Sequence, residues 1–224
     1  MDGRAIVVTG GHGVLGQAVV ALALEQGLKV ALIDHAKAAA PQGAVEFGGV
    51  DLTDPSAAAA ALQGANEAMG RIDGLLNIAG GFVWQTTEDA EPAWDRMFRL
   101  NLTTALNASR AALPFLRQSS DGRIVNVGAN AALKSAAGMG AYAASKSAVH
   151  RLTESLAEEL KGTGVTVNAV LPSILDTEQN RRDMPDADPA KWVRPRDLAA
   201  VMLFLASPES RAMTGALVPV VGRV

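Results

Sequence analysis

The chain has 224 residues, of which 49% are hydrophobic but only 4% aromatic, and its formal net charge is −3. This length suffices for one α/β domain, whose core must be built mostly from Ala, Val and Leu. A slightly acidic chain lacks the electrostatic footprint of a protein that binds nucleic acid or an anionic membrane. The chain has no cysteine, which excludes disulfides and thiol catalysis, and its three histidines are too dispersed to indicate a metal site.

The sequence also bears on location. No apolar run reaches the roughly 18 residues of a membrane span. The first residues, Met1-Asp2-Gly3-Arg4, lead directly into a strand pattern and not into a signal peptide. We therefore expect a soluble, cytoplasmic protein that does not enter a membrane.

Strand and helix patterns alternate along the whole chain. Apolar runs predict strands at Ala5–Thr9, Lys29–Asp34, Val45–Val50, Gly74–Ile78, Arg123–Gly128, Thr166–Leu171 and Ala216–Val221. Helical periodicity predicts helices at Val14–Gln26, Pro55–Met69, Pro92–Leu116, Met139–Lys161 and Arg196–Ala206. Right-handed βαβ crossovers then predict a doubly wound parallel sheet of about seven strands, as one Rossmann-type domain over residues 1–224.

Two local features refine this expectation. Asp54-Pro55 and Pro195-Arg196-Asp197 place a proline in the first turn of their helices, and Asp54 supplies an N-cap. The least regular stretch, residues 174–193, is rich in charge and proline and follows a strand end. Because ligands of open α/β sheets bind at the carboxyl ends of the strands, we expect this stretch to be a substrate lid.

A glycine-rich segment joins the first strand to the first helix. Gly11, Gly13 and Gly16 fit the G-x-G-x-x-G fingerprint, in which glycines allow a tight turn and close approach of the backbone to a pyrophosphate. The predicted loop consists of Gly10, Gly11, Gly13, Val14, Leu15 and Gly16. Asp34 ends the second strand, where a carboxylate binds ribose hydroxyls and repels a 2′-phosphate. No basic residue immediately precedes Asp34, and the loop has no lysine or arginine, so we expect NAD(H) in preference to NADP(H).

A tyrosine and a lysine stand one helical turn apart. Tyr142 and Lys146 are related as i and i+4, so their side chains lie on one face of the predicted helix. There the lysine charge is expected to lower the pKa of the phenol and make it a proton donor near neutral pH.

With these residues in order, the whole chain resembles the short-chain dehydrogenase/reductase family. The motifs that carry the resemblance are the glycine loop, Asp51-Leu52-Thr53, Asn77-Ile78-Ala79-Gly80, Leu100-Asn101-Leu102, Tyr142 with Lys146, and Pro172 to Thr177. The resemblance implies that Tyr142, Lys146 and Asn101 are catalytic, with Asn101 kinking its helix and holding a water of the proton relay. It further implies cofactor contacts for Asp51, Leu52, Asn77, Ala79, Gly80, Lys146, Pro172, Leu175 and Thr177. It also implies a homodimer or homotetramer, paired through the two long helices.

The chain departs from the commonest branch of this family at the position of the catalytic serine. Thirteen residues before Tyr142 stands Ala129. Asn130 and Ser135 are the nearby polar candidates to replace the missing hydroxyl. The C-terminal half, including Ala129 itself, resembles the NADH-dependent dihydropteridine reductases, which reduce quinonoid dihydropterins. Trp84 is then a candidate to stack on a flat substrate ring.

Three functional hypotheses remain open from the sequence. The first is an NADH-dependent reductase of a quinonoid, dihydropterin-like small molecule. The second is a carbonyl or alcohol oxidoreductase of unknown substrate in which Asn130, Ser135 or water replaces the serine. The third is a non-catalytic NAD(H)-binding regulatory or scaffold protein, which would have no physical need for Tyr142 and Lys146.

Overall fold

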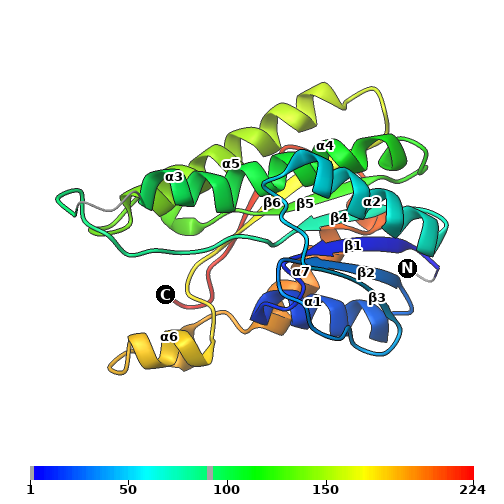
Figure 1. Cartoon of the computed structure of the whole chain (residues 1–224). Helices are drawn as coiled ribbons and strands as arrows, with labels where there is room; N and C mark the ends of the chain where they lie inside the picture. Colours follow the sequence, from blue (N-terminus) through cyan, green and yellow to red (C-terminus); the bar gives the residue numbers. More distant parts are fainter. Residues whose placement is uncertain (1–2, 90–92) are drawn as a thin grey trace.

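The sheet of this protein is seven-stranded and parallel, as the sequence predicts. The computed structural model describes residues 3–89 and 93–224. The strands follow the order β3-β2-β1-β4-β5-β6-β7 (Figure 1). They are β1 (Ala5–Thr9), β2 (Lys29–Asp34), β3 (Ala44–Gly48), β4 (Gly74–Asn77), β5 (Arg123–Val127), β6 (Thr166–Pro172) and β7 (Leu217–Val220). The doubly wound α/β fold is therefore confirmed.

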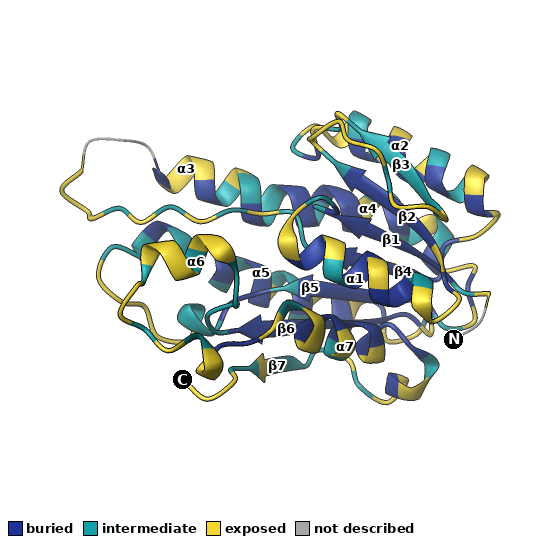
Figure 2. Ribbon diagram, turned by 90° about the horizontal axis from the view of Figure 1, so that it is seen from below, coloured by how far each residue is buried: buried dark blue, intermediate teal, exposed yellow. Residues whose placement is uncertain are grey.

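Helices cover both faces of the sheet, which explains why most strands are continuous apolar runs. The main helices are α1 (Val14–Glu25), α2 (Pro55–Met69), α4 (Thr104–Leu116), α5 (Gly140–Glu159) and α7 (Pro195–Leu205). One core lies between the sheet and α2, α4 and α5, and the other lies between the sheet and α1 and α7. The buried strands between these helices appear dark blue in Figure 2.

The predicted helix starts are confirmed. Asp54 caps α2, since its side chain accepts the Ser56 N–H at 2.8 Å. Pro195 occupies the first turn of α7. Both signals are local, so the sequence alone determines them.

The predicted helix Pro92–Leu116 is in fact three segments, and its first residue lies outside the described part of the chain. A short α3 (Ala93–Met97) leads into a π-helical segment, Phe98–Thr103, before α4 begins. Such a segment is the kink that the resemblance implies at Asn101. Its physical cause is a set of hydrogen bonds from the Asn101 side chain to a distant loop.

The predicted lid, residues 174–193, is more ordered than expected. It contains α6 (Glu178–Asp183), capped by Thr177, and a 3₁₀ turn, Pro189–Lys191. A parallel bridge between Leu175 and Val193 closes its base, with the Val193 N–H donating to the Ile174 carbonyl at 2.9 Å.

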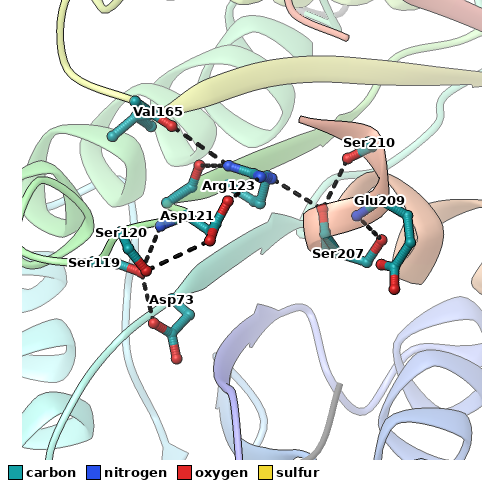
Figure 3. Close-up of polar contacts among 12 residues, drawn as sticks. Asp73, Ser119, Ser120, Asp121, Arg123, Val165, Ser207, Glu209 and Ser210 are labelled. Atoms are coloured by element: carbon teal, nitrogen blue, oxygen red, sulfur yellow. Dashed lines mark hydrogen bonds and ion pairs between the residues drawn. The ribbon is translucent and has the colours of Figure 1, made fainter. Parts of the chain in front are cut away.

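A buried polar network holds the amino edge of the sheet, opposite the ligand edge (Figure 3). The fully buried Asp73 carboxylate accepts the Ala5 N–H at 3.0 Å and the Ser119 hydroxyl at 2.6 Å. The Arg123 guanidinium, only 1% exposed, pairs with Asp121 at 2.9 Å and donates to the Ser207 carbonyl at 3.0 Å. These buried charges are compensated by partners, as a stable fold requires.

Candidate active site

A large cavity opens where the strand order of the sheet reverses. The reversal lies between β1 and β4, and in open α/β sheets this is where ligands bind. The cavity measures about 910 Å³. Its walls include ten of the predicted cofactor residues: Gly10, Gly13, Val14, Leu15, Asp34, Asp51, Leu52, Ala79, Gly80 and Leu175.

The glycine loop has two kinds of glycine. Gly10 has a φ of +67°, and a Cβ there would lie 2.8 Å from the Ala79 backbone, so only glycine fits. Side chains at Gly11 and Gly16 would collide with Leu32 and with the Gly10 carbonyl. These two glycines therefore pack the loop and do not line the cavity.

The first helix presents its N-terminus at this loop. Gly13 is the N-cap of α1, and no side chain caps the helix. First-turn N–H groups that lack an internal acceptor form a ready anion site, since the helix dipole adds positive potential. This cradle fits the pyrophosphate of a dinucleotide.

Two carboxylates, Asp34 and Asp51, line the cavity at the end of β2 and shortly after the end of β3. Asp34 accepts the His12 N–H and the Ala36 N–H, each at 2.9 Å. Asp51 accepts the Thr53 hydroxyl at 2.7 Å and the Thr53 N–H at 2.8 Å, and these bonds lower its pKa. Both side chains are thus fixed in place before any ligand binds.

Asn101 connects the loop after β4 with the helix that carries Tyr142. Its Oδ1 accepts the Gly81 N–H at 2.9 Å, and its Nδ2 donates to the Gly81 carbonyl at 3.1 Å. Nδ2 also donates to Ser145 Oγ at 2.9 Å, and that hydroxyl donates to the Tyr142 carbonyl at 2.7 Å. Sequence reasoning missed Ser145, although it stands inside the Tyr142 to Lys146 motif.

The expectation that Lys146 lowers the Tyr142 pKa is wrong in this structure. Burial raises the pKa of Tyr142 to about 12, and burial lowers the pKa of Lys146 to about 8. The Lys146 ammonium donates to the Val127 carbonyl at 2.7 Å, and Val127 lines the cavity. The i and i+4 spacing places Tyr142 and Lys146 on one face of the helix, but the Lys146 amine forms its hydrogen bond with the Val127 backbone.

Gly80 brings the lysine close to the cavity wall. A Cβ at Gly80 would lie 2.5 Å from Asn101 Oδ1 and 3.5 Å from Lys146 Nζ. Absence of a side chain at this position therefore lets the backbone approach both groups.

The serine position offers no hydroxyl and little free space. Ala129 is buried, and its N–H donates to His150 Nε2 at 3.3 Å. Burial lowers the pKa of His150, with smaller contributions from the charges of Arg151 and Lys146, so the ring is a neutral acceptor. Ser135 is exposed and donates to the neighbouring Ala136 carbonyl at 3.3 Å. The structure does not bring Ser135 to Tyr142.

Asn130 begins a 3₁₀ turn, Asn130–Ala132, directly after Ala129. Its side chain is partly buried. Of the two candidates to replace the serine, Asn130 therefore remains beside the position and Ser135 does not.

Two exposed aromatic side chains lie on the loop after β4. Phe82, which sequence reasoning missed, meets the Tyr142 ring edge-on with centroids 5.0 Å apart. Trp84 covers Gly138, where a Cβ would collide with the indole. Phe82 and Trp84 are 55% and 62% exposed, so both rings keep surface for a ligand.

Three predicted cofactor residues have structural contacts instead of a place in the cavity wall. Asn77 is buried and donates to Asn126 Oδ1 at 2.8 Å and to Ser109 Oγ at 3.0 Å, so its amide points behind the wall. Pro172 is buried at the end of β6. The Thr177 hydroxyl caps α6 by accepting the Asn180 N–H.

Sequence reasoning also missed charged residues that line the cavity. These are Asp95, Arg96 and Arg99, together with His35. Three of them lie on α3 and the π-helical segment, whose turn could not be read from the sequence. Across residues 3–89 and 93–224, no helix is long and apolar enough to span a bilayer. The same part of the chain holds no cluster of three or more metal-binding side chains.

Comparison with known proteins agrees with the geometry. The short chain dehydrogenase family profile matches residues 4–188, and this protein belongs to that family of oxidoreductases. The chain is 38% identical over 222 residues to the "inactive 2-(S)-hydroxypropyl-CoM dehydrogenase 2" of Xanthobacter autotrophicus, covering 89% of this chain and 96% of the relative. It is 30% identical over 235 residues to a 3-oxoacyl-(acyl-carrier-protein) reductase of Vibrio cholerae, covering 96% and 94%. The crystal structure of an NAD⁺-bound xylitol dehydrogenase has a TM-score of 0.89 at 25% identity, covering 99% and 98%.

The buried lysine predicts a particular pH dependence of stability. Because its pKa is lowered on folding, the unfolded chain binds more protons between about pH 8 and 10.5, and stability rises with pH there. Lys146→Met removes this contribution. Over this range the free energy of unfolding of the unmutated protein should therefore rise, relative to that of Lys146→Met, by roughly 1 kcal/mol per pH unit.

Urea denaturation at about pH 7 and about pH 9.5 measures the difference. Lys161→Met, which replaces an exposed lysine just after α5, is the matched control. A Lys146→Met difference that does not change with pH would show that the amine is not buried as described.

Proposed function

We propose that this protein is an NADH-dependent oxidoreductase in which Tyr142 is the proton donor to a small-molecule substrate. The observation that carries the proposal is the placement of α5 beside a cavity with a dinucleotide cradle. Asn101 joins this helix to the loop after β4, and Lys146 donates to the carbonyl of Val127, which lines the cavity. Bound NADH supplies the hydride at its nicotinamide. The residues of this chain hold the cofactor, orient the substrate and move the proton.

Different residues of the chain bind the parts of the cofactor and position the phenol. The N-terminus of α1 binds the pyrophosphate, and Asp34 binds the adenosine ribose. Lys146 binds the nicotinamide ribose from its place beside Val127. Leu175, which lines the cavity, meets the carboxamide. Asn101 holds the loop and α5 in register so that the phenol stays in place.

The raised pKa of Tyr142 is compatible with this role. A phenol with a pKa of about 12 stays protonated across the neutral range and is ready to donate. A substrate whose charge develops beside the hydroxyl draws the proton away in the transition state.

Two substrate classes fit the site for different reasons. A quinonoid, dihydropterin-like ring is supported by Ala129, because a conjugated electron-poor acceptor needs no second hydroxyl on a carbonyl oxygen. The exposed faces of Phe82 and Trp84 suit a flat ring. The comparisons give this substrate no support. They instead favour the second class, ketones or alcohols, through relatives named as an inactive 2-(S)-hydroxypropyl-CoM dehydrogenase and a 3-oxoacyl-(acyl-carrier-protein) reductase.

The third hypothesis is a non-catalytic NAD(H)-binding protein. The name of one relative contains the word "inactive", which describes that relative. In this chain the retained Tyr142, Lys146 and Asn101 argue for catalysis, since a scaffold gains nothing from burying a lysine.

The cofactor preference rests on Asp34, whose hydrogen bonds within the described part of the chain come from two backbone N–H groups and from no cation. We expect NADH to bind at least about ten-fold more tightly than NADPH, a difference of ~1.4 kcal/mol. Asp34→Ala should narrow the difference. Fluorescence titration measures both affinities, and equal values for the unmutated protein would contradict the role of Asp34.

We also propose a homodimer or homotetramer formed through α4 and α5. Light scattering at micromolar concentration should give at least twice the mass of the 23.1 kDa chain. The mass of a monomer would contradict the proposal.

The missing serine provides the test that separates the substrate classes. With a quinonoid ring, Ala129→Ser should leave kcat/KM within about three-fold, since little oxyanion charge develops. With a ketone, the added hydroxyl should raise kcat/KM by about ten-fold or more. Tyr142→Phe should lower turnover of either substrate by ~10²-fold or more.

The assay follows NADH oxidation with quinonoid dihydropterin and with a panel of small ketones. Turnover of ketones without turnover of the pterin would reject the ring hypothesis. No oxidation with any acceptor, despite NADH binding, would favour the scaffold.

A further inference from the structure

His12 connects the proposed ribose carboxylate to a second carboxylate. The His12 N–H donates to Asp34 Oδ2 at 2.9 Å, and its ring Nε2 lies 2.9 Å from Glu46 Oε1. The imidazole is mostly buried, with 15% of its side chain exposed. Neither His12 nor Glu46 has a role in the function proposed above.

The sheet register explains why these groups meet. In the β2 and β3 pair, Leu32 is opposite Glu46 and Asp34 is opposite Gly48. Alternate residues of a strand share a face, so Glu46 stands on the same face as Leu32 and Asp34. The glycine loop covers that face, since a side chain at Gly11 would collide with Leu32. Glu46 therefore lies beneath the loop, at the adenosine end.

The second oxygen of Glu46 is unusual. Within residues 3–89 and 93–224, Glu46 Oε2 is buried and has no hydrogen-bond partner. A buried acceptor without a donor lowers stability, and an apolar side chain of similar length would avoid that loss. Packing alone therefore does not account for a carboxylate here, and the contact with His12 is the interaction that does.

We infer that Glu46 is a specificity-determining positioning residue, which tethers the His12 imidazole to β3 and withholds it from a cofactor 2′-phosphate. His12 is the one side chain between Gly10 and Gly16 that is able to donate a hydrogen bond or carry a charge. A 2′-phosphate on a ribose held by Asp34 would lie beside this loop, where a free imidazole would bind it. The inference rests on the proposed preference for NADH.

Glu46→Met tests the tether, because methionine fills a similar volume but accepts no comparable hydrogen bond. The released imidazole should strengthen NADPH binding by about five-fold or more, while NADH binding changes by no more than about three-fold. Glu46→Gln has a side chain of the same length and keeps an acceptor oxygen. Its ratio of NADPH to NADH affinity should therefore stay within about two-fold of the unmutated value. The double variant His12→Ala with Glu46→Met should lose the gain.

The measurement is fluorescence titration of each variant with NADH and with NADPH near pH 7, with Glu67→Gln on α2 as an exposed control. An unchanged ratio of NADPH to NADH affinity in Glu46→Met would overturn the inference. A gain that persists in the double variant, or equal weakening of both cofactors with a lowered Tm, would also overturn it. If Glu46→Met does not fold, Glu46→Ser, whose hydroxyl is too short to reach His12, replaces it.

The inference and the proposed cofactor preference fail in different ways. Equal affinities of the unmutated protein for the two cofactors would reject the preference. The tether is tested by the change in the ratio of NADPH to NADH affinity between variants. Its outcome is therefore separate from the preference of the unmutated protein.

Discussion

The side chain of Asn101 is the constraint on which the candidate active site depends. It forms hydrogen bonds with both backbone groups of Gly81 and with Ser145, so one amide joins the loop after β4 to α5. The helix that carries Asn101 opens into a π-helical segment at that point. The absence of a side chain at Gly80 allows the close approach. Tyr142 and Lys146 are thereby held beside the end of β4.

The two edges of the sheet use polar groups differently. At the amino edge, buried charges such as Asp73 and Arg123 have partners at short distance, and they stabilise the fold. At the carboxyl edge, burial moves the pKa values of Tyr142 and Lys146 away from their ordinary values. Perturbed titratable groups of this kind concentrate at functional sites, where stability is lower in exchange for reactivity.

The fold could be predicted because its signals are local. Buried parallel strands such as Lys29–Asp34 are apolar runs, and caps such as Asp54 lie next to the helices they start. The glycine loop and Asp34 were found for the same reason, since strand, turn and helix follow one another directly in sequence.

The remainder of the site depends on contacts between distant residues. The turn at Asn101 is set by Gly81, and the Lys146 ammonium donates to Val127. Neither the split helix nor the raised pKa of the buried Tyr142 therefore followed from spacing. The edge contact of Phe82 with Tyr142 has no sequence pattern. The same is true of the pair formed by His12 and Glu46, which joins the glycine loop to β3.

The most direct test of this account is the kcat of Asn101→Leu for NADH oxidation, with whichever acceptor the unmutated protein reduces. Loss of the amide should displace Tyr142 and lower kcat by ~10²-fold, as expected for a misplacement of about 1 Å. Asn168→Leu removes a buried amide that binds the Met213 carbonyl and the Ala216 N–H, none of which lines the cavity, and serves as the matched control, with kcat near the unmutated value. An Asn101→Leu variant that folds and keeps its kcat within about two-fold would contradict the account.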